Sequence, residues 1–201
     1  MSAFAVTDDG HVLARFDDAE ASILLSLSEQ FAELVAGAGD PAAALDPAVA
    51  RLFPDAYRDD PQASAEFSRY TRSDLAAVKA DAAATVRSAL GGDESAHLES
   101  AGIGEAGHPV GARAESGGTD VLLDAADGWS WLRHLADLRL TIAARLGVVE
   151  DPHAFDDDPD ADDLSEEDLL ARSVFDWLGY VQELLITALE EAATGPSSPS
   201  A

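Results

Sequence analysis

The sequence predicts a mainly α-helical fold, a bundle of about five helices with a small N-terminal β-hairpin and room for a third short strand. Three observations lead to this expectation. Apolar residues recur at helical spacing in several long segments, and acidic or hydroxyl residues that can cap a helix precede most of them. The apolar fraction, 47% of 201 residues, is normal for a globular core although the formal charge is −27. We therefore expect one composite domain with a packed interior.

Residues 1–90 are expected to hold the hairpin and the N-terminal helices. Residues 4–6 and 11–16 have apolar positions spaced as in strands, and turn-forming residues join them. Asp17 and Glu20 have the spacing of a capping box, in which the side chain of each residue accepts a hydrogen bond from the backbone N–H of the other. This pair predicts the start of the first long helix.

Proline and capping residues mark the next helix starts. Asp46 and the proline after it open a short helix, and Asp60 with its following proline opens another that runs to about residue 70. Thr71 and Asp74 form a further cap-and-acid pair. That pair predicts a separate helix, which leads into 75–90.

The middle of the chain changes character twice. Residues 91–118 hold eight of the fifteen glycines and show no sustained periodicity, which predicts a flexible insert. Residues 119–123 could add a third strand to the hairpin, since an isolated hairpin is only marginally stable in water. Asp124 then begins the most apolar helix, over 129–147. Its large apolar side chains point in all directions around the helix axis. We expect this helix to lie centrally.

The C-terminal part, 119–194, contains an acidic linker over 149–164 and ends in a long helix. Across 150–168, 11 of 19 residues are acidic and none is Lys or Arg, which is typical of an extended solvated segment. Ser165 caps the last helix, and 195–201 form a frayed polar tail. The 4-3-4-3-4 spacing of Leu170, Val174, Trp177, Val181, Leu184 and Ala188 predicts a packing seam that would also allow a homodimer. The expected core centres on Trp131, Leu135, Leu138, Ile142, Trp177, Val181 and Leu184.

Composition excludes several classes of function. The absence of cysteine excludes disulfides, thiolate nucleophiles and Cys-ligated metal centres. No membrane span or signal peptide is recognisable, so the expected location is cytoplasmic. A charge of −27 opposes binding to nucleic acid or anionic lipid. The acidity and the single lysine, Lys79, fit either a GC-rich genome or adaptation to high salt.

Motifs for catalysis or metal binding are weak. Residues 156–167 carry acids at four EF-hand positions, but Ala161 stands where glycine is needed and Pro159 lies inside the loop. The five histidines show no metal-ligand spacing, and neither a nucleophile elbow nor a phosphate-binding loop is present. We therefore expect a non-enzymatic protein without a metal or other cofactor.

Arg139 is the most informative single residue because its neighbours at helical spacing are apolar. A charge in such a stripe needs a partner. Asp176 or Glu183 on the last helix could supply it, as could Asp55 in the turn after the short helix. Arg139 would either form a structural ion pair that fixes the register of the two helices, or act as an anchor for a carboxylate of another protein. The candidate interaction or ion-pair residues are Arg139, Asp137, Asp55, Tyr57, Arg58, Asp176, Trp177 and Glu183.

Three motifs in order carry a family resemblance: LFPDAYRDDP at 52–61, WSWLRHLADLRL at 129–140 continuing to ARLGV at 144–148, and FDWLGYVQELL at 175–185. Together they resemble the actinomycete oxidative-stress transcriptional regulators (AosR-like proteins), formerly an actinobacterial family of unknown function encoded beside the Clp protease adaptor. The resemblance implies a cytoplasmic regulator that works with a sigma factor or RNA polymerase. The gene neighbourhood implies an alternative, a Clp-associated adaptor or assembly factor.

The sequence departs from that family at two places. A redox-sensing cysteine pair is impossible here, and Ala136 replaces the Asn associated with the family's motif. Direct DNA binding is also not expected. Arg133, Arg139 and Arg145 are spaced by six residues, so successive side chains are turned by about 600° and point to different faces. We expect any promoter effect to be carried by a protein partner.

Overall fold

The computed structural model describes residues 2–40, 43–57, 59–91, 112–113, 118–147 and 165–194. The predicted acidic linker, the tail at 195–201 and most of the predicted 91–118 insert lie outside the described residues. So do Arg58, most of the EF-hand-like loop and three of the five histidines, His97, His108 and His153.

An antiparallel sheet contains the predicted hairpin and third strand. Its order is β1 (Ala3–Val6), β2 (Val12–Phe16), β4 (Thr119–Leu123) and β3 (Ala112–Arg113). The strand β3 lies within the insert that was expected to hold no regular element, so that expectation is wrong at these two residues. Two residues are too few to show a side-chain period, and their pairing with β4 uses the backbone alone.

All five helices in the described part of the chain begin close to their predicted starts, including the helix that Asp60 caps. The helix α1 (Asp18–Ala36) has the capping box of Asp17 and Glu20, and α2 (Pro47–Leu52) is capped by Asp46. Asp124 caps α5 (Ala125–Arg145), and the hydroxyl of Ser165 accepts from the backbone of Asp168 at the start of α6 (Glu166–Thr194). Two short 3-10 helices, Gly37–Gly39 and Ala43–Leu45, connect α1 to α2.

The fifth helix differs from its prediction. Residues 61–89 form one continuous helix, α3 (Pro61–Ala89), where two helices were expected. Thr71 does not cap a new helix: its hydroxyl donates to the carbonyl of Phe67 one turn earlier. This back-bonding uses the polar group without interrupting the backbone ladder, so the cap-like pattern was misleading.

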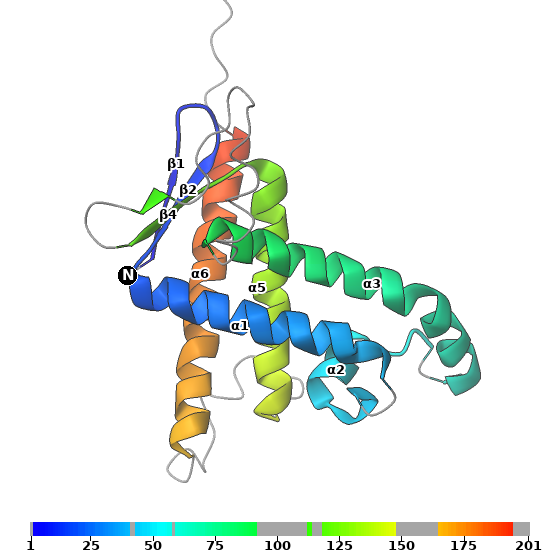
Figure 1. Cartoon of the computed structure of the whole chain (residues 1–201). Coiled ribbons are helices and arrows are strands. Elements are labelled where there is room, and N and C mark those ends of the chain that lie inside the picture. Colours follow the sequence, from blue (N-terminus) through cyan, green and yellow to red (C-terminus); the bar gives the residue numbers. More distant parts are fainter. Residues whose placement is uncertain are drawn as a thin grey trace, which may run out of the picture.

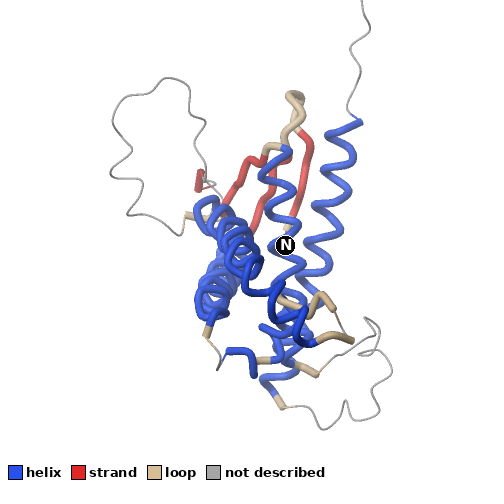
Figure 2. The backbone as a smooth tube through the Cα atoms, turned by 90° about the vertical axis from the view of Figure 1, so that its right-hand side faces the viewer, coloured by secondary structure: helices blue, strands red, loops and turns tan. Residues whose placement is uncertain are grey.

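The helices form layers around α5 (Figure 1). The helices α1 and α3 pack against each other and cross in front of α5, which runs antiparallel to α6. The side view shows these layers, with the sheet at one end beside α5 and α6 (Figure 2). The central position of α5 is therefore confirmed.

The core joins the sheet to α5 and α6. Phe16 of β2 stacks on the fully buried Trp131 with ring centroids 5.7 Å apart. Gly128 lets α6 approach closely, because a Cβ there would lie 2.5 Å from a methyl of Leu189. Trp131, Leu135, Leu138 and Val181 are buried as predicted, whereas Ile142, Trp177 and Leu184 are only half-buried.

The seam of α6 keeps Val181 and Ala188 as predicted, but Phe175, Leu178 and Leu185 are buried in place of the residues before them. Leu170 is 66% exposed, and the buried positions are Phe175, Leu178, Val181, Leu185, Ala188 and Leu189. The apolar arc of α6 is wide enough for both registers, and contact with α5 and β1 selects this one.

Candidate interaction site

Arg139 has no acidic partner within the described residues. Its guanidinium lies 4.5 Å from the centre of the Phe175 ring, and its Nη1 donates to Oε1 of Gln182 at 3.0 Å. Gly179 makes room for it, since a Cβ there would lie 3.3 Å from the guanidinium carbon. An aromatic face and a neutral amide thus take the place of the predicted carboxylate.

The predicted acidic partners lie elsewhere. Asp176 and Glu183 are exposed on α6, one position beyond the residues that meet Arg139. One position turns a helix by about 100°, which is enough to move both carboxylates to the solvent side. Asp55 lines a groove between α1 and α3. Trp177 is half-buried, and no described residue accepts a hydrogen bond from its indole nitrogen. The predicted ion pairs of Arg139 with these acids are therefore wrong.

Asp137 does form an ion pair, with the only lysine of the chain. Lys79 Nζ of α3 lies 2.6 Å from Oδ1 of Asp137 on α5, and both side chains are more than four-fifths buried. The backbone carbonyl of Asp137 also accepts from Thr141. This pair fixes the position where α3 crosses α5.

A second buried polar contact lies between α1 and α5. Ser28 Oγ and His134 Nε2 are 2.8 Å apart, and both residues have no exposed surface. Burial lowers the pKa of His134 to about 4, and the charge of Lys79 acts in the same direction. His134 is therefore neutral near pH 7. Solvent and substrates do not reach this serine and histidine in the described conformation.

The arginines of α5 occupy three separate environments, as their spacing predicts. Arg133 donates to the carbonyl of Trp129, Arg139 packs on Phe175, and Arg145 lies 3.7 Å from Asp46. They form no continuous basic stripe. In the described ranges, no group of three His, Asp or Glu side chains is arranged to hold a metal ion. No helix of the described chain is both long and apolar enough to cross a membrane.

Residues 61–78 form the amino-terminal part of α3, whose tip projects beyond α1 and α2 (Figure 1). Large apolar side chains lie exposed along one side of it, and we call this side the outward face. It comprises Phe67, Tyr70, Leu75 and Val78, which are 46%, 71%, 41% and 52% exposed. Their spacing places them within an arc of about 140° around the helix. A stripe that would normally be covered by another element is here open to solvent.

Tyr57 extends the outward face. Its ring meets that of Phe67 edge to face, with centroids 6.1 Å apart. Ser64 holds this segment in place: its hydroxyl accepts from the backbone N–H of Tyr57 and donates to the carbonyl of the same residue, at 2.9 and 2.8 Å. The two aromatic rings are thus presented by a fixed backbone.

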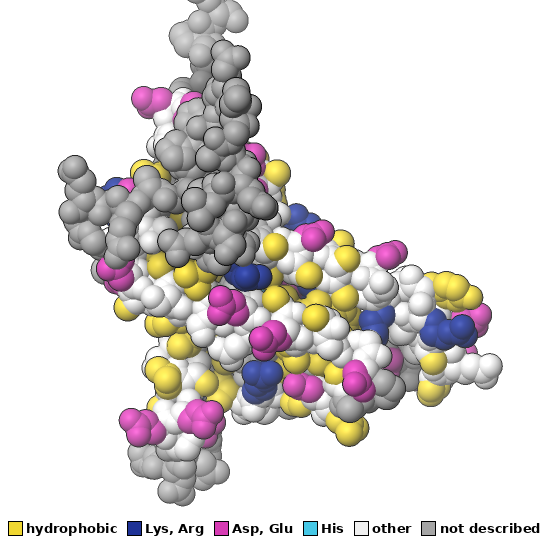
Figure 3. All heavy atoms as spheres, viewed as in Figure 1, with side chains coloured by type: hydrophobic (Ala, Val, Ile, Leu, Met, Phe, Trp, Pro, Cys, Tyr) yellow, Lys and Arg dark blue, Asp and Glu magenta, His cyan; other side chains and the backbone are white. Residues whose placement is uncertain are grey.

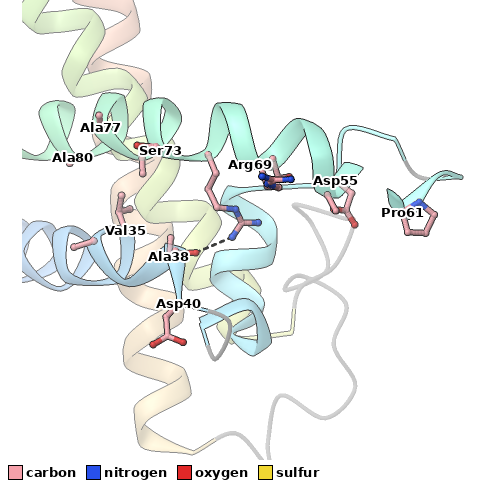
Figure 4. Close-up of a pocket in the computed structure, with 15 residues that line it drawn as sticks. Val35, Ala38, Asp40, Asp55, Pro61, Arg69, Ser73, Ala77 and Ala80 are labelled. Carbon is pink, nitrogen blue, oxygen red and sulfur yellow. Dashed lines mark hydrogen bonds between the residues drawn. The ribbon is translucent and has the colours of Figure 1, made fainter. Parts of the chain in front are cut away.

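The opposite side of α3 lines a groove of about 830 Å³ against the end of α1 and the first 3-10 helix. Its walls are mainly small apolar side chains, including Val35 and Ala38 on one side and Ala77 and Ala80 on the other (Figure 4). Arg72 donates to the carbonyl of Ala38 at 3.0 Å and lies over the Phe53 ring. Two arginines and two aspartates line the groove, so its charges balance: Arg69, Arg72, Asp40 and Asp55.

The surface view shows hydrophobic side chains along α3 and at its projecting end, beside charged groups of both signs (Figure 3). Sequence reasoning named Tyr57 and Asp55 but missed Phe67, Tyr70 and Ser64. The cap and proline signals predicted a helix here, but they do not tell which of its sides is covered. A low count of large apolar residues on the other side of 61–78 was the available signal.

Residues 1–189 match the protein-family model described as Domain of unknown function (DUF2017), and the chain belongs to that family. No curated protein and no solved structure matches it.

Proposed function

We propose that this chain is a non-enzymatic, cytoplasmic regulatory protein that works by binding another protein. The observation that carries the proposal is the outward face of α3, an exposed apolar stripe on a projecting helix. Contiguous exposed apolar surface of this kind typically marks a site of protein contact. The resemblance to oxidative-stress transcriptional regulators supports a partner in transcription, a sigma factor or RNA polymerase.

The charge of the chain favours a protein partner over DNA. A net charge of −27 provides no excess of positive charge for binding phosphate groups. The three arginines of α5 each contact a different group of the protein. The absence of cysteine removes thiol switching, so regulation would depend on binding and not on disulfide formation.

The test is a binding experiment with purified components. The tagged chain is presented with core RNA polymerase, with individual sigma factors and with Clp components from its own organism. We expect saturable retention of a polymerase or sigma subunit by the wild-type chain. Retention of Clp components alone would favour the adaptor alternative, and retention of none of them would contradict the proposal.

A further inference from the structure

The charged residues of α3 are divided between its two sides. At about 100° per residue, Glu66, Asp74 and Asp81 all lie within about 100° of the direction of Phe67. The four cations of the helix, Arg69, Arg72, Lys79 and Arg87, all lie about 120° or more away from that direction. Acids therefore lie within the outward face and along its Tyr70 edge, whereas Arg72 and Lys79 lie along its Leu75 edge.

Two of these cations, Arg72 and Lys79, are also held by contacts within the fold. Lys79 pairs with Asp137, and Arg72 is bound to the Ala38 carbonyl and the Phe53 ring. Arg69 lines the groove. Glu66, Asp74 and Asp81 are all exposed, as is Arg69. The three carboxylates beside the outward face are thus available to a partner, whereas Arg72 and Lys79 are engaged within the fold.

The aromatic side chains add a second attraction for cations. Tyr57, Phe67 and Tyr70 expose ring surface within the same face. Aromatic faces attract guanidinium and ammonium groups, most strongly where water is excluded. Leu75 and Val78 continue the face with aliphatic surface, which fits apolar side chains of a partner.

We propose that the outward face of α3 binds a basic amphipathic helix of a partner protein, an inference that rests on the proposed function and names the class of partner. The apolar side of that helix would cover Phe67, Tyr70, Leu75 and Val78. Its Lys and Arg side chains would meet Glu66, Asp74 and Asp81. These three acids span 15 residue steps, about 22 Å of helix, which corresponds to about four turns of the bound segment.

Charge argues against other occupants of this face. A second copy of the chain would bring the same acids together on both sides of the contact, and each copy carries −27. Nucleic acids and anionic membranes would be repelled by the same groups. A basic protein segment is attracted both locally and by the field of the whole molecule.

The test uses a synthetic helical peptide of about 18 residues, with Leu on one side and Lys and Arg along both flanks. A control peptide has Glu in place of every Lys and Arg. Binding to the full chain is followed by fluorescence anisotropy at about 0.15 M salt, where long-range attraction is screened. We expect saturable binding of the basic peptide and none of the acidic one.

Matched variants separate the outward face from general attraction to an acidic protein. Phe67→Ser/Tyr70→Ser leaves the charge unchanged and should weaken basic-peptide binding at least about tenfold. Leu169→Ser/Tyr180→Ser makes a comparable change on the exposed side of α6 and should alter it less than about twofold. Asp74→Lys should likewise weaken binding more than Glu190→Lys, although both change the net charge equally.

Equal losses for the α3 and α6 variants would overturn the proposal, because binding would then reflect net charge alone. Failure of the basic peptide to bind the wild-type chain would overturn it as well. The proposed function is decided separately, by the experiment with polymerase, sigma and Clp components. If one of those partners bound the Phe67→Ser/Tyr70→Ser variant as tightly as the wild type, the regulatory function would stand and this face would not be its site.

Discussion

The two parts of α3 meet different surroundings although they belong to one uninterrupted helix. In residues 79–89 the buried side chains Ala82, Ala83, Val86 and Ala89 pack into the core. In residues 61–78, all of them described, only Ser64 is buried and the large apolar side chains face solvent. An amphipathic pattern therefore predicts a helix in both parts, but it does not tell which part is covered by the protein itself.

The buried ion pair lies between these two parts. Lys79 ties α3 to Asp137 of α5 at the point where the core-packed part begins. Rigid anchoring at this point supports the projecting part, because helix hydrogen bonds carry order from 79–89 into 61–78. We therefore expect the stability of the protein to depend on the carboxyl-terminal part and its binding properties on the amino-terminal part.

The largest expected effect comes from breaking the ion pair. Lys79→Met leaves Asp137 charged and buried, and should lower the free energy of unfolding by about 3 to 5 kcal/mol. Arg15→Met is the control, because it breaks a solvent-exposed pair with Asp120 and should cost far less. Urea denaturation measures both. A loss as small as that of the control would show that the Lys79 pair does not anchor α3, whereas adding Asp137→Leu to Lys79→Met should restore much of the stability.

The next effect is a loss of stability in mild acid. His134 is neutral in the folded chain, with a pKa of about 4, and has a pKa near 6.5 when unfolded. Its contribution is therefore complete above pH 6.5 and is lost as the pH falls toward 4, by roughly 3 kcal/mol in total. Unfolding measured across that range should show this slope in the wild type and lack it in His134→Gln. Asp17 and Asp120 have lowered pKa values, so they change the stability only below about pH 4. They therefore do not affect the comparison of the wild type with His134→Gln above that pH.

The smallest effect compares two valines on the same helix. Val86 is fully buried and Val78 is 52% exposed. Val86→Ala should cost about 1.5 to 3 kcal/mol through lost burial and a residual cavity. Val78→Ala should change stability by less than about 0.5 kcal/mol, since alanine favours the helix and little surface is lost. Equal costs, measured by thermal or urea unfolding, would contradict the division of α3 into a core part and an exposed part.

Most of the architecture follows from local signals in the sequence. The hairpin, the third strand and the starts of α1, α2, α5 and α6 depend on turn residues, caps and periodicity, which act over a few positions. Two features required tertiary information. The seam of α6 was displaced by one position over part of its length because its contacts choose between two apolar registers, and the pattern at Thr71 is compatible with both a cap and a helix interior.

The candidate site was only partly predictable. Arg139 was recognised as a charge in an apolar stripe, but its partners Phe175 and Gln182 depend on the rotation of α6 and on the space left by Gly179. Asp137 was named without its partner, because Lys79 is 58 residues away in the chain. The outward face was missed because exposure is a property of the assembled fold.

Hydrogen exchange along α3, measured with and without the basic amphipathic peptide, tests the central claim most directly. In the free chain, amides of 80–89 should exchange slowly by near-global unfolding, and those of 65–77 should exchange faster through local opening of the same helix. The peptide should then slow exchange selectively in 65–77 and leave α6 unchanged. Equal protection of both parts in the free chain, or peptide-induced protection concentrated on α6, would contradict the claim that one helix divides between a core role and an exposed binding role.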